Sequence, residues 1–337
     1  MTTPRDTVTE NLGQLFMVGL AGLEVDDSTR DLVRRCGINH FILFKRNVAT
    51  PAQLAGLCQG LAAVCREAGL GAPLISIDQE GGTVTRLPPP FTQFPDARTL
   101  AEGAEPEAAL REYATTCARE LREVGINMNL APVLDVCPAG EGRFMERRVL
   151  GGDPATVARL GRLVIETMQQ AGVAACAKHF PGLGAATLDP HKVLPVVVRP
   201  AAELRRLDLP PFAAACKAGV AAVMTSHTIY TGLDGQTPAT LSAAILQGLL
   251  RTELGYDGLV ITDDLEMGAI ENGQSVAAAA LAAFVAGADM LLICHDHDKV
   301  RAAYDGLRGA LPAGQIAGER VSQSLDRIAA VQRRFAG

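Results

Sequence analysis

Eight short apolar segments alternate with amphipathic helical patterns along the whole chain, and this alternation limits the fold more than any other feature. The apolar segments span residues 15–20, 38–44, 74–77, 126–136, 173–177, 221–225, 259–262 and 290–294. Segments with helical spacing lie at residues 51–68, 105–124, 154–171, 201–218, 242–254 and 275–286, and a closing one spans 314–335. Eight strand–helix units in one chain predict an α/β fold, a (β/α)8 TIM barrel, better than a doubly wound sheet.

Capping residues support the same boundaries. Thr50 and Asp153 are N-cap residues, each followed by a proline that suits the first helical position. A glycine follows each of six predicted helices, where a C-terminal cap is expected: these are Gly37, Gly125, Gly172, Gly219, Gly255 and Gly287. Because no linker or low-complexity segment interrupts the pattern, we expect residues 1–337 to form a single domain.

Composition excludes other classes of protein. The 337 residues are 48% hydrophobic and 20% charged, with a net charge of −6, which is typical of a globular protein with a large core. The negative charge and the lack of a Lys/Arg-rich run argue against a nucleic-acid partner. No apolar run reaches the roughly 18 residues of a membrane span. The first six residues lack the pattern of a signal peptide.

The cysteines indicate the redox environment. They are scattered and form no C-x-x-C pair: Cys36, Cys58, Cys65, Cys117, Cys137, Cys176, Cys216 and Cys294. Most lie within apolar patterns, which favours buried free thiols in a reducing cytoplasm over disulfides or a zinc site. We therefore expect a cytoplasmic protein without membrane contacts, a monomer or weak oligomer, with no metal and no cofactor.

Chemically active side chains collect where the predicted strands end. TIM-barrel enzymes build their sites at these carboxyl ends. The strand ends carry Asp78-Gln79-Glu80, Asp135, Lys178-His179, Ser226-His227, Asp263-Asp264 and His295-Asp296. Five of the six histidines fall in the following loops, and only His40 lies inside a predicted strand. This distribution predicts a polar pocket at one mouth of the barrel.

Two features of the strand ends suggest a reaction. Asp189 stands two residues before His191 in a Pro/Gly-rich loop, so its carboxylate can hold the imidazole and raise its basicity. Such an imidazole can donate a proton near neutral pH. Asp263 follows an apolar strand that would hold it rigidly, as a nucleophile toward a carbon centre requires. The neighbouring Asp264 could equally be the functional residue, or could cap the helix that follows.

The remaining polar groups suit a sugar. Asp78, Arg148, Lys178 and His179 supply donors and acceptors for a polyhydroxylated ligand. Aromatic residues make up only 4% of the chain and tryptophan is absent, so stacked platforms for a long polysaccharide are not expected. A small, terminal sugar bound mainly by hydrogen bonds is the expected partner.

Six motifs together resemble one family. They are IDQEGGTVTRL at 77–87, RVLGGDP at 148–154, KHFPG at 178–182, MTSH at 224–227, PATLS at 238–242 and ITDDL at 261–265. In this order they resemble the family 3 glycoside hydrolases, specifically the bacterial β-N-acetylglucosaminidases of the peptidoglycan-recycling type. The resemblance extends from about residue 12 to residue 294.

The resemblance implies a retaining, two-step hydrolysis on a TIM barrel. It implies that Asp263 is the nucleophile and that His191, oriented by Asp189, is the general acid/base. The sugar-binding residues of the family align with Asp78, Arg148, Lys178 and His179. His227 matches a pocket histidine, which we count among the substrate-binding residues. The expected substrate is a terminal N-acetylglucosamine of muropeptide or chitin-derived fragments.

The sequence departs from the family pattern at two positions. Leu183 stands where the family motif Pro-Gly-His-Gly has a histidine, and Leu150 stands where an aromatic residue is usual. Asp189 and His191 are retained, so the chemistry should persist. The departure at Leu183 leaves open how the loop is anchored and how fast the reaction runs.

Alternative functions remain open at this stage. A histidine acid/base does not repel phosphate as a carboxylate would, so a phosphorylase of the same fold is possible. Lys178 at a strand end could form a Schiff base, as in an aldolase. The change at Leu183 would also suit a non-catalytic sugar-binding protein.

Other polar residues have structural interpretations that we favour. We expect Glu80 to accept backbone donors or to pair with Arg86, and Arg147 to be a surface or supporting cation. The cluster at residues 295–298 contains two histidines and two aspartates, as a metal site would. A polar loop that caps the following helix is the preferred interpretation.

Overall fold

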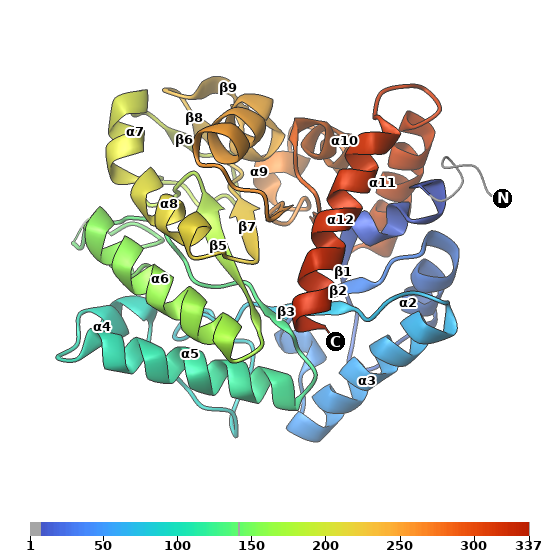
Figure 1. Ribbon diagram of the computed structural model, residues 1–337, viewed down its shortest axis with the longest axis horizontal. Coiled ribbons are helices and arrows are strands. Elements are labelled where there is room, and N and C mark those ends of the chain that lie inside the picture. The colour runs from blue at the N-terminus through green and yellow to red at the C-terminus, as the bar shows by residue number, and fades with distance from the viewer. Residues whose placement is uncertain (1–7, 141, 337) are drawn as a thin grey trace.

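The computed structural model describes residues 8–140 and 142–336, in which eight parallel strands form a nearly closed barrel surrounded by helices (Figure 1). The barrel strands are β1 (Phe16–Gly19), β2 (His40–Leu43), β3 (Leu74–Ile77), β4 (Met128–Asn129), β5 (Ala174–Phe180), β7 (Ala222–Thr225), β10 (Leu259–Ile261) and β11 (Leu291–Ile293). Their hydrogen-bonded order is β10-β7-β5-β4-β3-β2-β1-β11. Each of the eight predicted strand segments overlaps a barrel strand, so the predicted TIM barrel is confirmed, although β5 runs three residues beyond the predicted 173–177.

Helices cover the outside of the barrel. The longer ones are α3 (Pro51–Glu67), α5 (Pro106–Glu123), α6 (Pro154–Gln170), α8 (Leu209–Lys217), α10 (Val276–Ala286), α11 (His297–Ala310) and α12 (Gly318–Phe335), with a π-helical segment, η5 (Ala244–Glu253). Shorter ones are α2 (Asp27–Asp31), the π-helical η2 (Leu32–Cys36), α4 (Ala97–Ala101), α7 (Ala201–Leu207) and α9 (Gly268–Glu271). Three 3-10 turns are η1 (Leu12–Leu15), η3 (Lys45–Asn47) and η4 (Ala239–Leu241).

The predicted caps are present. The Thr50 and Asp153 side chains accept hydrogen bonds from the backbone N–H groups of Gln53 and Thr156. All six glycines predicted to end helices have positive φ, a backbone conformation that other residues adopt at a cost. The eight cysteines are free thiols, and all except the partly exposed Cys216 are buried.

Two predicted elements are interrupted in the structure, and a proline explains each interruption. The predicted strand 126–136 is regular only over β4 and continues as a single bridge between Val133 and Lys178. Pro132, between them, has no N–H to donate to the ladder. The predicted helix 201–218 is split at Asp208, because Pro210 fits only the first turn of the new helix α8.

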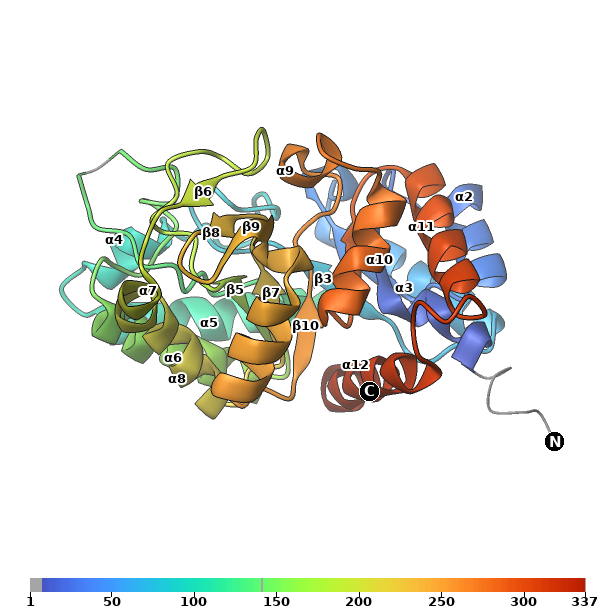
Figure 2. The same cartoon turned by 90° about the horizontal axis from the view of Figure 1, so that it is seen from above.

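A small three-stranded sheet, which the sequence did not predict, lies beyond the strand ends. It consists of β6 (Val196–Val197), β8 (Ile229–Tyr230) and β9 (Asp234–Pro238). Figure 2 shows β6 and α9 at one end of the molecule and α12 at the other. The small sheet and α9 therefore mark the end of the barrel at which the strands finish.

Helix α12 supports the seam where the barrel closes. Here β10 and β11 are joined by one parallel bridge, Ile261 to Met290. Buried Asp289, just before β11, accepts hydrogen bonds from the Val260 N–H in β10 and from Arg251 of η5. From α12 it accepts hydrogen bonds from Arg320, Ser324 and Arg327. One carboxylate thus joins both seam strands to two helices.

Two features of the sequence bear on membranes and export. Among the described residues, no helix combines the length and the apolar character that crossing a membrane would require. The expectation that the chain lacks a signal peptide rests on residues 1–6, which lie outside the described residues.

We predict that Asp289→Asn lowers the free energy of unfolding by about 3–5 kcal/mol, because it leaves three partly buried arginine charges without their buried carboxylate. Asp257→Asn is the matched control. Asp257 also pairs with Arg327, but its side chain is 90% exposed, so its loss should cost at most about 1 kcal/mol. Urea unfolding of both variants checks the prediction, and equal losses would contradict it.

Candidate active site

A cavity of about 250 Å³ opens where the barrel strands end. Six of the predicted site residues line it: Asp78, Arg148, Lys178, His179, His191 and Asp263. Apolar side chains complete its wall, among them Phe44, Leu130, Leu183, Met224 and Met267. Residues that are far apart in the sequence thus meet at the carboxyl end of the barrel, as the positions of the strand ends predicted.

The floor of the cavity is a cluster of buried ion pairs. Lys178 Nζ lies 2.7 Å from Asp78 Oδ1 and 2.7 Å from Glu80 Oε1. Arg148 makes a two-pronged contact with the Glu80 carboxylate, at 2.7 and 2.9 Å. Arg86 contacts Asp78 at 3.3 Å. The expectation that Glu80 pairs with Arg86 is therefore wrong: the Arg86 partner is Asp78, and Glu80 pairs with Lys178 and Arg148.

The ion pairs set the charge states of the floor. Burial works to raise the pKa of the Glu80 carboxyl, but the charges of Lys178 and Arg148 outweigh it and hold that pKa well below its ordinary value. Burial works to lower the pKa of Lys178, and the two carboxylates instead raise it. A Schiff-base lysine needs a free amine near neutral pH, so this environment disfavours the aldolase alternative.

Asp135 fixes the orientation of His179. Its Oδ2 lies 2.8 Å from His179 Nδ1, and its Oδ1 accepts the backbone N–H groups of His179 and Leu183 at 3.2 and 2.6 Å. The side chain of Asp135 is fully buried. From the sequence, Asp135 is predicted only to stand at a strand end, without a role in the site. Arg86 also lines the cavity without having been predicted as a site residue, although it follows Asp78 within one motif.

The loop after β5 is anchored through its backbone. Besides the Leu183 N–H, the Gly182 carbonyl accepts a hydrogen bond from the Tyr230 hydroxyl at 3.0 Å. Gly184 packs so closely that a Cβ there would lie 2.1 Å from the Val136 carbonyl oxygen. None of these contacts needs a histidine at position 183. The loop therefore keeps its attachment although Leu183 replaces the family histidine.

The Asp189–His191 pair stands at the mouth of the cavity. His191 Nδ1 lies 2.7 Å from Asp189 Oδ1, which also accepts the His191 backbone N–H at 3.0 Å. Partial burial works to raise the pKa of Asp189, but the hydrogen bonds from His191 bring it below its ordinary value. The carboxylate is therefore ionised and holds the ring by one nitrogen, leaving the other nitrogen to face a ligand.

The end of β10 holds Asp263 rigidly. The preceding Thr262 donates its N–H to the Met290 carbonyl at 3.0 Å and accepts the Leu292 N–H on its hydroxyl at 2.9 Å. Asp263 Oδ1 accepts the Asp264 N–H at 2.9 Å. The backbone that carries Asp263 is thus fixed to β11 through Thr262, and the carboxylate is oriented by the N–H of the following residue.

His227 supports this strand end from behind. It is buried, and it is absent from the residues that line the cavity. Its Nε2 donates to the Asp264 carbonyl at 2.9 Å, and its Nδ1 lies 2.7 Å from the Thr240 hydroxyl. Burial lowers its pKa, so the ring is neutral. With both nitrogens engaged, His227 has no free donor or acceptor for a sugar.

Asp264 differs from Asp263 in its charge state. Its carboxyl accepts the Glu266 N–H at 3.1 Å and caps no helix, since the N-cap of α9 is Met267. Burial above all raises the pKa of Asp264 to about 7, and the negative charges of Glu266 and Asp263 add to this effect. A carboxyl that holds its proton near neutral pH is a poor nucleophile, which favours Asp263 between the two.

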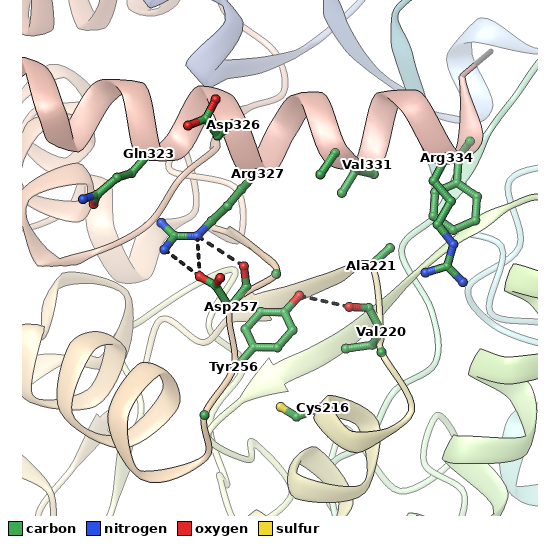
Figure 3. Close-up of a pocket in the computed structure, with 15 residues that line it drawn as sticks. Cys216, Val220, Ala221, Tyr256, Asp257, Gln323, Asp326, Arg327, Val331 and Arg334 are labelled. Carbon is green, nitrogen blue, oxygen red and sulfur yellow. Dashed lines mark hydrogen bonds and ion pairs between the residues drawn. The ribbon is translucent and has the colours of Figure 1, made fainter.

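Of the cluster at residues 295–298, His295 lines this cavity, and the polar groups that follow lie outside it. Asp296 caps α11, and His297 contacts Ser28 and the Gly19 carbonyl. Arg147 pairs with Asp96 and is largely exposed. In the part of the chain that the structure describes, no three His, Cys, Asp or Glu residues form a group that could hold a metal. A second hollow, of about 640 Å³, lies between α12 and the starts of β7 and β10 (Figure 3), and none of the predicted site residues lines it.

The barrel and the cavity are those of a TIM-barrel enzyme. The family model described as "Glycosyl hydrolase family 3 N terminal domain" matches residues 7–331. A β-hexosaminidase of Thiobacillus denitrificans is 40% identical over 290 residues, which cover 84% of this chain and 79% of that protein. The chain therefore belongs to glycosyl hydrolase family 3.

Solved structures are similar over nearly the whole chain. A family 3 β-N-acetylglucosaminidase from a Paenibacillus species superposes with a TM-score of 0.94 at 42% identity and covers 97% of this chain. The present chain spans only 62% of that longer protein. A β-N-acetylhexosaminidase from Beutenbergia cavernae gives a TM-score of 0.89 at 31% identity and covers 97% of this chain and 98% of its own.

We predict that Asp264→Asn changes how stability depends on pH. The folded pKa of about 7 lies above the ordinary value of 3.8, so the folded protein binds this proton more tightly than the unfolded chain does. The stabilising contribution is complete below about pH 4 and is lost as the pH rises through about 7. The asparagine variant lacks this loss. Between pH 4 and pH 8, the difference between the free energies of unfolding of the variant and the wild type should shift by roughly 2–4 kcal/mol in favour of the variant. Parallel pH profiles of the two proteins would contradict the prediction.

Proposed function

We propose that the protein is a retaining exo-β-N-acetylglucosaminidase that removes a terminal N-acetylglucosamine through a covalent intermediate on Asp263. The observation that carries this proposal is that Asp263 and His191 line the same cavity, with Asp189 holding the imidazole. A retaining glycosidase needs a nucleophile and an acid/base on opposite sides of one glycosidic bond. The names of the similar proteins supply the N-acetylhexosamine specificity.

In the first step, the Asp263 carboxylate attacks the anomeric carbon of the sugar. The bond between that carbon and the leaving oxygen breaks, and the imidazolium of His191 gives its proton to the leaving group. In the second step, neutral His191 takes a proton from water while the water oxygen attacks the anomeric carbon. Asp263 then leaves as a carboxylate, and His191 is again an imidazolium.

The ion-paired floor binds the sugar. Asp78 accepts hydrogen bonds from hydroxyl groups, while Arg148, Lys178 and His179 offer donors whose positions are set by their carboxylate partners. His227 orients the end of β10 instead of touching the sugar. Because the cavity of about 250 Å³ is small, it suits one terminal sugar, in keeping with exo cleavage.

The setting of the enzyme follows from the same reasoning. We assign muropeptide or chitin-derived fragments as substrates, a cytoplasmic location, and a single domain over residues 1–337 that acts without a cofactor as a monomer or weak oligomer. The eight free cysteines support the reducing compartment.

We predict that the wild type releases the chromogen from an aryl β-N-acetylglucosaminide, and that Asp263→Ala lowers kcat at least ~10⁴-fold because the nucleophile is lost. Asp264→Asn is the matched control at the next residue and should retain most of the activity. Chromogen release measured at neutral pH checks both. Comparable losses in the two variants, or retained turnover in Asp263→Ala, would rule out the assigned nucleophile.

Product analysis then separates hydrolysis from phosphorolysis. With and without inorganic phosphate, we expect free N-acetylglucosamine as the product. A sugar 1-phosphate formed only in the presence of phosphate would identify a phosphorylase. Binding of the sugar without turnover would identify a non-catalytic protein.

A further inference from the structure

We propose that Gly268 and Asn272, which follow the nucleophile strand, are positioning residues that hold the acid/base loop over the cavity. The inference rests on the proposed function of His191 and adds the means by which that residue is placed. It concerns α9 and the residue after it, which form a platform beneath residues 190–192 of the loop.

Three consecutive loop carbonyls are held by the platform. The Pro190 carbonyl accepts the Ala269 N–H at 3.1 Å, and the His191 carbonyl accepts the Gly268 N–H at 3.3 Å. The Lys192 carbonyl accepts a hydrogen bond from the Asn272 side-chain amide, at 3.2 Å. The contacts include His191 itself, so they restrict the backbone from which the imidazole projects.

The platform has these donors because it is the start of a helix. The first N–H groups of a helix have no partner within the helix. In α9 those of Gly268 and Ala269 are used by the loop. A backbone carbonyl can dock there without any particular side chain on the loop. This explains how the loop is held although its sequence offers few anchoring side chains.

The loop contributes little apolar anchoring of its own around His191. Leu188 and Val193, on either side, are 51% and 43% exposed, while Pro190 is buried. The His191 side chain is 66% exposed. The position of the loop is therefore set mainly by the three hydrogen bonds to the platform and by Pro190, which is buried in the cavity wall.

The platform is in turn fixed to the nucleophile end of β10. The Met267 N–H donates to the Asp264 carbonyl at 3.1 Å. The Glu266 carboxylate accepts the backbone N–H groups of His295 and Asp296, which ties the same turn to the end of β11. Only four residues separate Asp263 from Gly268. This short, hydrogen-bonded segment therefore fixes the position of the acid/base loop relative to the nucleophile.

The absence of a side chain at Gly268 is required by the docking. A Cβ there would lie 2.7 Å from the Lys192 carbonyl oxygen, which must then move, and 3.0 Å from that of His191, which must give way by a few tenths of an ångström. The φ of Gly268 is outside the left-handed region, so alanine fits the helix backbone itself. Gly268→Ala should therefore displace the loop without straining α9.

The experiment compares Gly268→Ala and Asn272→Ala with the matched control Gly273→Ala. At Gly273 the nearest atom to a new Cβ is the Ile270 carbonyl oxygen at 3.6 Å, an ordinary contact, and φ again is not left-handed. Each variant is assayed for kcat/KM with phenyl and with 2,4-dinitrophenyl β-N-acetylglucosaminide. The phenyl group needs protonation to leave, whereas the dinitrophenyl group does not.

We expect Gly268→Ala to lower kcat/KM for the phenyl substrate about 10- to 100-fold, the effect of a misplaced catalytic group. Asn272→Ala should lower it about 3- to 10-fold through one lost hydrogen bond. For both variants kcat/KM with the dinitrophenyl substrate should change less than about 2-fold, because glycosylation then needs no acid. Gly273→Ala should match the wild type with both substrates.

Each other outcome has a defined meaning. If the wild type cleaves neither substrate, the proposed function fails. If the wild type is active but Gly268→Ala and Asn272→Ala lose activity equally with both substrates, or lose none, the positioning role is overturned. If Gly268→Ala does not fold, the exposed Asn272 decides the question, and an unselective loss there overturns the inference.

Discussion

The bridge that Lys178 forms between Asp78 and Glu80 is the interaction on which the catalytic end of the barrel depends. The ammonium group is buried with one carboxylate on each side at 2.7 Å. Arg148, paired with Glu80, supplies the second positive charge that balances the two carboxylates. Because the desolvation of such ions offsets most of their attraction, the cluster gives little net stability. What it provides is geometry: β3, β5 and the segment before α6 present charged donors and acceptors at fixed positions around one sugar-sized space.

The opposite end of the barrel supports that geometry. Asp289 accepts the Val260 N–H in β10 and also hydrogen bonds from arginines of α12 and η5, which it thereby links to the seam. Val260 lies three residues before Asp263. The closure of the barrel and the placement of the nucleophile are therefore consequences of the same strand pairing. From Asp263 the chain continues directly into α9, which receives the loop of His191. The strand end with Asp263 and the loop with His191 thus both border the cavity. A two-step displacement requires this, because one group attacks the sugar and the other donates the proton.

Much of this arrangement follows from local sequence patterns. The eight strands were predictable because buried parallel strands are short apolar runs between capped helices, and the site residues were predictable because TIM barrels collect function at strand ends. The breaks at Pro132 and Pro210 were not predicted, because the apolar pattern runs through both prolines and indicates one continuous strand and one continuous helix. The missing N–H of each proline interrupts the element in the structure. The pairing of Glu80 with Lys178 and Arg148, the Asp135–His179 contact and the engaged nitrogens of His227 depend on which loops meet in space. No spacing along the chain carries that information, and the docking of the loop on α9 uses carbonyls that any sequence would have.

The central claim is that the carboxylate of Asp263 forms a bond to the anomeric carbon. The most direct measurement is mass spectrometry of the protein after incubation with a slow 5-fluoro N-acetylglucosaminyl substrate, followed by digestion and fragmentation of the labelled peptide. The account predicts one sugar attached to Asp263 in the peptide that spans the end of β10. A label on Asp264 or His191, or release of the sugar with inverted configuration and no label, would contradict it.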